Sequence, residues 1–268
     1  MTLEALIFDV DGTLADTEEA HRTAFNRAFE RLQLGWSWSR TEYRELLNVT
    51  GGKERIAAYI VSLPIGASER ARLLASVPAI HDEKTRFYTR VVRDGGIPLR
   101  DGVERLIAEA IDAGCRLAIA STTTAANVDA LLTSTLGARG LDLFTVIACG
   151  DQVRAKKPAP DIYHMVLSTL GLGPHQAVAV EDSVNGLRSA MAARLWTLVT
   201  PTFWTDGGDF RGAGLVLPRL GDPQDPLEGE PGRRLLDAAW LTFEELARRA
   251  HPARPVSPVQ ALYQGAHR

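Results

Sequence analysis

Cysteine is scarce in this chain of 268 residues, which has only Cys115 and Cys149, each inside a hydrophobic run. Such isolated thiols are expected to be buried and inert in a reducing cytosol, neither paired in a disulfide nor bound to a metal. An excess of positive charge is also lacking, because the formal net charge is −3. The chain therefore has no basic field to attract nucleic acid, and we expect no such partner.

Long hydrophobic runs are missing as well. The apolar stretches are far shorter than a membrane span, so no membrane partner is expected. Residues 1–5 carry no basic segment of a secretory signal and lead directly into an apolar strand. These absences predict a cytoplasmic protein. The sequence does not decide the oligomeric state, and a monomer is our working expectation.

Short apolar runs alternate with amphipathic segments through most of the chain. The runs predict strands at residues 6–8, 116–120, 144–148, 177–180, 196–199 and 215–217. Helical spacing of apolar residues lies between several of them. This alternation predicts right-handed βαβ units, and hence an α/β fold with a doubly wound, Rossmann-like parallel sheet.

One long segment breaks the alternation. Residues 17–93 show only helical periodicity, so we predict a helical cap inserted after the first strand of a core formed by residues 1–16 and 94–220. Residues 221–268 would form a C-terminal extension. The segment 218–232, rich in Pro, Gly and Asp, is expected to be a linker, residues 233–250 one amphipathic helix, and the tail from His251 disordered.

Polar residues follow the predicted strands where each strand ends. They are Asp9 and Asp11, Ser121, Lys157 (in a loop some residues past its strand), and Glu181 with Asp182. In a parallel sheet the loops at the carboxyl ends of the strands converge on one crevice, so these groups are expected to share a site.

Their chemistry fits phosphoryl transfer. A phosphomonoester is dianionic, so its charge must be offset before a nucleophile can approach. The carboxylates of Asp9, Glu181 and Asp182 are hard oxygen ligands suited to Mg²⁺. Lys157 adds a cation, and Ser121 adds hydrogen-bond donors. Gly12 permits the sharp chain reversal that would turn Asp11 back toward the leaving oxygen.

In order and spacing, residues 9–14 (DVDGTL), 121–122, 157–158 and 181–183 resemble the four signature motifs of the haloacid dehalogenase superfamily. The resemblance covers about residues 4–205. It implies that Asp9 is the nucleophile forming an aspartyl-phosphate and that Asp11 is the general acid and base. It further implies that Asp9, the backbone carbonyl of Asp11, and Asp182 hold Mg²⁺, with Glu181 as a further ligand or as support.

The helical insertion resembles the subgroup that contains β-phosphoglucomutase and CbbY-type phosphatases, most closely the CbbY type. That resemblance implies hydrolysis of a small phosphosugar, specifically a sugar bisphosphate such as xylulose 1,5-bisphosphate, an inhibitor of the Calvin cycle enzyme Rubisco. The substrate-binding residues that it implies are Glu18, His21, Gly51, Gly52, Lys53, Glu54, Arg55, His81, Lys84, Ser121, Thr122, Thr123 and Asn127.

Several alternatives stay open. The activity could be that of a phosphomutase, although Glu18 matches the phosphatase branch more closely. The chain could also be a noncatalytic phosphometabolite-binding protein, although this would require a damaged motif and none of the four is damaged. Lys84 could extend its ammonium to solvent instead of binding phosphate. Lys156, unlike Lys157, is expected to face solvent. Residues 51–53 lack the Ser or Thr and the preceding strand that a nucleotide-binding P-loop requires.

Overall fold

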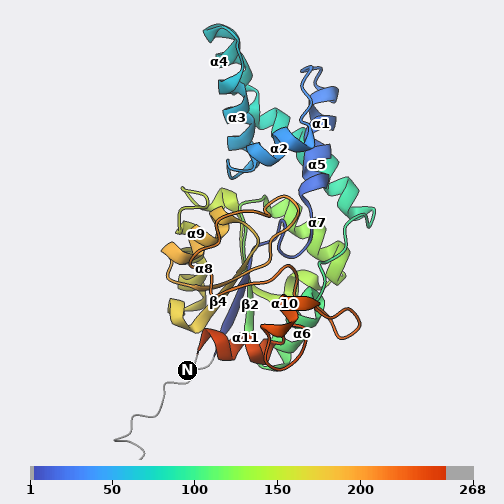
Figure 1. Ribbon diagram of the computed structural model, residues 1–268. Coiled ribbons are helices and arrows are strands. Elements are labelled where there is room, and N and C mark those ends of the chain that lie inside the picture. The colour runs from blue at the N-terminus through green and yellow to red at the C-terminus, as the bar shows by residue number, and fades with distance from the viewer. Residues whose placement is uncertain (1–2, 252–268) are drawn as a thin grey trace, which may run out of the picture.

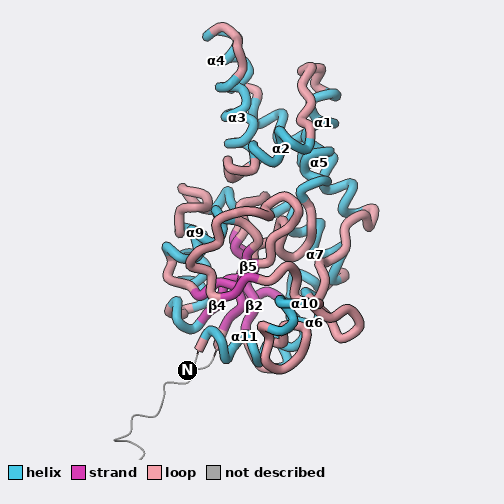
Figure 2. Tube along the Cα trace, in the orientation of Figure 1, coloured by secondary structure: helices cyan, strands magenta, loops and turns pink. Residues whose placement is uncertain are grey.

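The computed structural model describes residues 3–251 and contains a six-stranded sheet at its centre (Figure 2). The strands are β1 (Ala5–Phe8), β2 (Arg116–Ala120), β3 (Phe144–Ala148), β4 (Ala177–Glu181), β5 (Trp196–Val199) and β6 (Leu215–Val216). Their order is β3-β2-β1-β4-β5-β6, and every neighbouring pair is parallel. The predicted α/β class with a doubly wound Rossmann-like sheet is confirmed.

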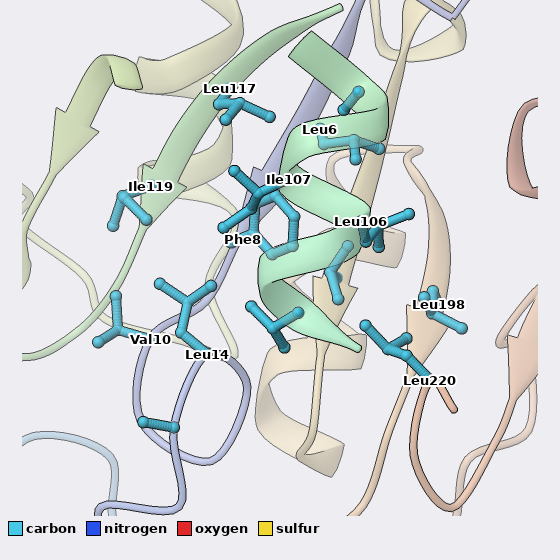
Figure 3. Close-up of a cluster of buried hydrophobic side chains, with 14 of the residues drawn as sticks. Leu6, Phe8, Val10, Leu14, Leu106, Ile107, Leu117, Ile119, Leu198 and Leu220 are labelled. Atoms are coloured by element: carbon cyan, nitrogen blue, oxygen red, sulfur yellow. The ribbon is translucent and has the colours of Figure 1, made fainter. Parts of the chain in front are cut away.

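Alternating residues of the strands face two separate hydrophobic layers. Leu6 and Phe8 of β1 join one cluster with Leu106 and Ile107 of α6 (Val103–Asp112), as Figure 3 shows. Alanines and Ile7 on the opposite face pack against α8 (Asp161–Leu170) and α9 (Val184–Ala192). Helix α7 (Ala125–Leu136) covers the first face together with α6. Both faces are thus closed by helices, which leaves the carboxyl ends of the strands for a site.

The chain between β1 and α6 forms five helices that stand together at one end of the molecule (Figure 1). They are α1 (Glu18–Arg31), α2 (Arg40–Leu46), α3 (Gly52–Ser62), α4 (Ala67–Ala75) and α5 (Val77–Arg93). They bury a hydrophobic cluster of their own, built around Phe25, Phe29, Trp38 and Tyr43. The helices occupy the segment predicted as the cap, and we use that word for α1–α5 below.

The C-terminal segment differs from its prediction. The single helix expected at 233–250 is wrong: α10 (Gly229–Arg233) and α11 (Phe243–Ala250) are separated by non-helical chain in which Leu235 and Leu241 turn into the core. The side chain of Thr242 accepts a hydrogen bond from the Glu245 amide and starts α11 anew.

The segment 218–232 is not a free linker either, because Leu220 and Leu227 are buried in the same core cluster. Apolar burial, which a count of Pro and Gly does not reveal, overrides composition here. The predicted disordered tail, apart from His251, lies outside the described residues.

Both cysteines are buried and free, as predicted. Burial raises the pKa of the Cys115 thiol to about 12 and that of Cys149 to about 11, so neither is a reactive thiolate. Within residues 3–251, every helix is too short or too polar to cross a bilayer.

Candidate active site

Asp9 and Asp11 lie in the loop that leaves β1, the central strand of the sheet. The Asp9 amide donates to the Val180 carbonyl of β4 at 2.9 Å, which ties this loop to the neighbouring strand. Gly12 has a φ of +84°, and a side chain there would collide with the Asp182 carboxylate. The positive φ fits the chain reversal expected at this glycine, and the missing side chain also allows the two acidic segments to approach each other.

Lys157 joins the loop that carries Asp9 to the end of β4. Its Nζ lies 2.7 Å from Asp9 Oδ1 and 2.6 Å from Glu181 Oε1, and all three side chains are buried. Burial opposes the charge on Lys157, but the two carboxylates outweigh it and raise the pKa of the lysine above its ordinary value. The Tyr163 hydroxyl of α8 donates to the same Glu181 oxygen at 2.5 Å. Lys157 is thus a fixed, permanent cation beside Asp9.

Asp9, Glu181 and Asp182 can each offer a carboxylate oxygen to one point, since one oxygen from each lies within 4.8 Å of the others. Burial and the adjacent acids raise the pKa of Asp9 to about 8 despite Lys157, and they raise that of Asp182 well above its usual range. The second Glu181 oxygen, Oε2, is buried without a hydrogen-bond partner. Three crowded carboxylates with an unsatisfied oxygen fit a divalent cation.

Asp11 is held in a different network. Its Oδ1 accepts hydrogen bonds from the Thr17 hydroxyl at 2.6 Å and from His21 Nε2 at 2.8 Å, and Lys84 Nζ lies 2.5 Å from His21 Nδ1. Burial would raise the pKa of Asp11, but His21, Thr17 and Lys84 together hold it below its ordinary value. The Asp11 side chain is thus held by this network and is not part of the cluster formed by Asp9, Glu181 and Asp182.

Lys84 is buried, so the alternative of an ammonium extending to solvent is wrong. Its Nζ lies 5.1 Å from the centre of the Phe25 ring and 4.9 Å from that of Tyr88. Burial lowers its pKa to about 7, although the nearby Asp11 acts in the opposite sense. The cap thus places beside His21 a buried lysine that can lose its charge near neutral pH.

A single cavity between cap and sheet collects most of the predicted site. The residues that were predicted from the sequence to belong to the site and that line this cavity are Asp9, Asp11, Glu18, His21, Gly51, Gly52, Lys53, Arg55, His81, Lys84, Thr122, Thr123, Lys157 and Asp182. Burial and neighbouring lysines lower the pKa of His81 to about 3, so that this ring is neutral.

Four predicted residues lie behind this lining. Ser121 accepts a hydrogen bond from the Thr123 amide, and Asn127 donates to the Thr123 hydroxyl, so both shape the loop that does face the cavity. Glu181 forms an ion pair with Lys157, which does line the cavity. Glu54 turns to Lys156, 2.9 Å away.

That ion pair corrects the expectation for Lys156, whose side chain is only 14 % exposed and lines the cavity. The carboxylate of Glu54, across the boundary between cap and core, draws it inward. A second pair crosses the boundary between Lys53 and Asp151 at 3.4 Å. Asn185 donates to the Thr50 hydroxyl at 2.9 Å. No sequence signal singled out Asp151 or Asn185, because their partners lie about 100 residues or more away in the chain.

Comparison with known proteins places this constellation in a family. The family model described as haloacid dehalogenase-like hydrolase matches residues 6–199. The chain belongs to the haloacid dehalogenase-like hydrolases. The prediction of an enzyme of the phosphoric monoester hydrolase class is confirmed at this level.

The curated relatives of this hydrolase include CbbY proteins. It is 50 % identical to the plasmid CbbY of Cupriavidus necator over 84 % of this chain and 89 % of that protein. The crystal structure of CbbY from Rhodobacter sphaeroides with phosphate has a TM-score of 0.75 and 46 % identity, covering 82 % of this chain and 95 % of that one. A CbbY mutant from the same organism, solved with xylulose-(1,5)bisphosphate, matches equally well. A β-phosphoglucomutase of Mycobacterium bovis is 25 % identical over 74 % of this chain and 80 % of that one.

Proposed function

We propose that this hydrolase is a Mg²⁺-dependent phosphatase that acts on a small phosphosugar through an aspartyl-phosphate on Asp9. The observation that carries the proposal is the meeting of Asp9, Glu181 and Asp182 within 4.8 Å, with Lys157 bound to the first two. A carboxylate buried among other acids destabilises the folded protein unless a cation binds to it, so the surroundings of Asp9 favour a metal site.

Asp9, Asp182 and the backbone carbonyl of Asp11 would hold Mg²⁺, with Glu181 as a further ligand or as the support of Lys157. When bound, the cation would offset the charges of the attacking carboxylate and the phosphate oxygens. Lys157 adds a second positive charge on the side of Asp9. Ionised Asp9 is the form that attacks, and the cation favours that form.

In the first step a carboxylate oxygen of Asp9 bonds to phosphorus while the bond from phosphorus to the sugar oxygen breaks. Asp11 gives its proton to that leaving oxygen. His21 and Lys84 keep the pKa of Asp11 low in the free enzyme, and the negative charge of a bound phosphate raises it. In the second step Asp11 takes a proton from water, the water oxygen bonds to phosphorus, and the bond to Asp9 breaks.

Cations from both the cap and the core are available for a second phosphate. Lys53, Arg55 and Lys156 line the cavity above Asp9, and Lys84 lies deeper. Two of them, Lys53 and Lys156, are paired with Asp151 and Glu54, partners that a phosphate dianion could replace. Together with the CbbY relatives, these cations favour a sugar bisphosphate such as xylulose 1,5-bisphosphate, which would place the enzyme beside the Calvin cycle.

The proposal is tested by measuring inorganic phosphate released from pentulose and hexose mono- and bisphosphates, with Mg²⁺ or with a chelator. We expect turnover of a bisphosphate that needs Mg²⁺ and is lost in Asp9→Asn. Conversion of a bisphosphate to an isomer without phosphate release would support the phosphomutase instead. Binding of phosphosugars without any turnover would support the noncatalytic alternative. Retained turnover in Asp9→Asn would reject Asp9 as the nucleophile.

A further inference from the structure

A tryptophan of the core is buried inside the cap. Trp204 lies in the loop after β5, yet it is 5 % exposed and belongs to the hydrophobic cluster of the cap. Its ring meets Tyr43 of α2 edge to face, with ring centres 5.5 Å apart. Such pairs contribute beyond their buried area because the ring edge and the ring face carry opposite partial charges. The loop is therefore joined to the cap by packing and not only by surface polar contacts.

Tyr43 carries this contact on to the cavity. It is fully buried, its hydroxyl donates to Glu18 Oε2 at 2.7 Å, and it accepts a hydrogen bond from Arg55 at 3.0 Å. The Arg55 guanidinium also lies over the Tyr43 ring at 5.1 Å. Glu18 and Arg55 both line the cavity. The position of the Tyr43 ring thus sets the position of two cavity groups.

The other end of the loop contacts the acidic cluster. The Thr205 hydroxyl, on the residue next to Trp204, lies 3.3 Å from Asp182 Oδ2. The turn between these contacts is held by its own hydrogen bonds: the Thr202 amide donates to the Thr205 hydroxyl at 2.9 Å, and the Trp204 amide donates to the Thr202 hydroxyl at 3.1 Å. These hydrogen bonds tie Trp204 and Thr205 into one turn.

We propose that Trp204 is a positioning residue, which fixes Tyr43, and through it Glu18 and Arg55, relative to the carboxylates at the sheet edge. The inference rests on the proposed function, because it assigns the tryptophan to substrate placement in the same cavity. Without the indole, Tyr43 loses its aromatic contact to the core, and the cap groups are no longer held in register with Asp182. A misplacement of about 1 Å between reacting groups can reduce turnover about 100-fold.

The test compares two substrates in Trp204→Ala. Xylulose 1,5-bisphosphate would need the cap groups, whereas p-nitrophenyl phosphate offers only one phosphate and an aromatic leaving group to the carboxylates. We expect kcat/KM for the bisphosphate to fall about 10- to 100-fold and that for p-nitrophenyl phosphate to change less than about twofold. Trp204→Phe, which keeps an aromatic edge for Tyr43, should recover most of the loss.

Trp36→Ala is the matched control. Trp36 packs in the same cap cluster, against Phe29 and Tyr59, without a ring contact to the core loop. Trp36→Ala should leave the ratio of kcat/KM values for the two substrates close to that of the wild type. If Trp204→Ala lowers kcat/KM equally for both substrates, or if Trp36→Ala reproduces the selective loss, Trp204 only stabilises the cap and the inference is overturned.

Amide hydrogen exchange gives a readout that does not depend on activity. Trp204→Ala should speed exchange in residues 43–55 about tenfold or more over the wild type, and more than Trp36→Ala does. Unchanged exchange there would overturn the positioning role, whether or not the substrate is right. A wild-type enzyme that releases no phosphate from any phosphosugar would instead reject the proposed function, while the exchange comparison would still decide the role of Trp204.

Discussion

At the scale of single residues, the site is a set of charges that oppose one another. Asp9 is buried beside Glu181 and Asp182, and only Lys157 compensates it. The pKa of Asp9 therefore lies at about 8, with burial as the main cause. A carboxyl group with this pKa is largely protonated at neutral pH unless a cation binds to it. The proposed role of the metal thus follows from the cost of the buried carboxylates.

The affinity for Mg²⁺ should depend on pH with a definite sign. The cation binds ionised Asp9, and below about pH 8 the proton competes with it. Calorimetric titration should show the apparent affinity rising from pH 6 to 8, by roughly tenfold per unit for one displaced proton, and levelling off above pH 8. Asp209→Asn, which removes an acid outside this cluster, should keep the same slope. An affinity that does not change over this range would contradict the assignment of Asp9 as a ligand.

Asp9→Asn should stabilise the metal-free protein while it abolishes turnover. In the wild type the folded state keeps a proton on Asp9 up to about pH 8, whereas the unfolded chain loses it near 3.8. Because the folded state binds more protons, stability falls as pH rises through this window, and an uncharged amide avoids that loss. Thermal unfolding in chelator should give a higher Tm for Asp9→Asn at pH 8 and a smaller difference at pH 5. A lower Tm at pH 8 would show that Asp9 is stabilised as an anion.

At the scale of elements, the site depends on how closely α9 approaches the end of β4. Gly186 in the first turn of α9 leaves room for the Glu181 carboxylate, which a methyl group at that position would overlap. The Ser183 hydroxyl accepts from the Gly186 amide at 3.1 Å and starts the helix there. The helix start and the acidic pair are therefore fitted to each other.

Gly186→Ala should weaken Mg²⁺ binding and lower Tm, although alanine usually favours a helix by about 0.5–1 kcal/mol over glycine. The added methyl displaces Glu181 and, with it, Lys157. Gly66→Ala is the control, because that glycine has a negative φ and open space around it. It should leave both metal binding and Tm almost unchanged. Equal effects of the two substitutions would contradict the close fit between α9 and Glu181.

The sequence predicted what is local and missed what depends on packing between elements. Asp9, Asp11 and Asp182 were predictable because they lie within three residues of the end of an apolar run, and parallel strands bring such ends together. Two tyrosines that donate hydrogen bonds to site carboxylates were not predicted. Tyr163 donates to Glu181 and Tyr43 donates to Glu18, but in the sequence both look like ordinary apolar positions of helices. The break between α10 and α11 was missed because Leu235 and Leu241 continue a helical pattern while packing in another conformation.

At the scale of the whole molecule, the cap and the C-terminal segment lie at opposite ends of the sheet (Figure 1). The C-terminal segment buries Leu241 and Leu246 in the core cluster and packs α11 against α6. The Phe243 amide also donates to Glu109 of α6 at 2.7 Å. Residues 221–251 therefore contribute to the core without lining the cavity.

Substitutions of two leucines can show whether this segment affects only the stability of the protein or also its activity. Leu246 is fully buried, whereas Leu236 is 73 % exposed. Leu246→Ala should cost about 2–5 kcal/mol of unfolding free energy, and Leu236→Ala should cost little. Below the unfolding transition, both variants should keep the kcat of the wild type. Equal stabilities in denaturant titrations would contradict the packing of α11 on the core.

The proposed mechanism requires that Asp9 carry the phosphoryl group during turnover. This can be measured by mixing the enzyme and Mg²⁺ with xylulose 1,5-bisphosphate bearing labelled phosphate, quenching in acid within one turnover, and locating the label in peptides. We expect a transient label on the peptide that contains Asp9, with no label in Asp9→Asn. Label that enters inorganic phosphate without residing on Asp9, or that resides on another residue, would contradict it.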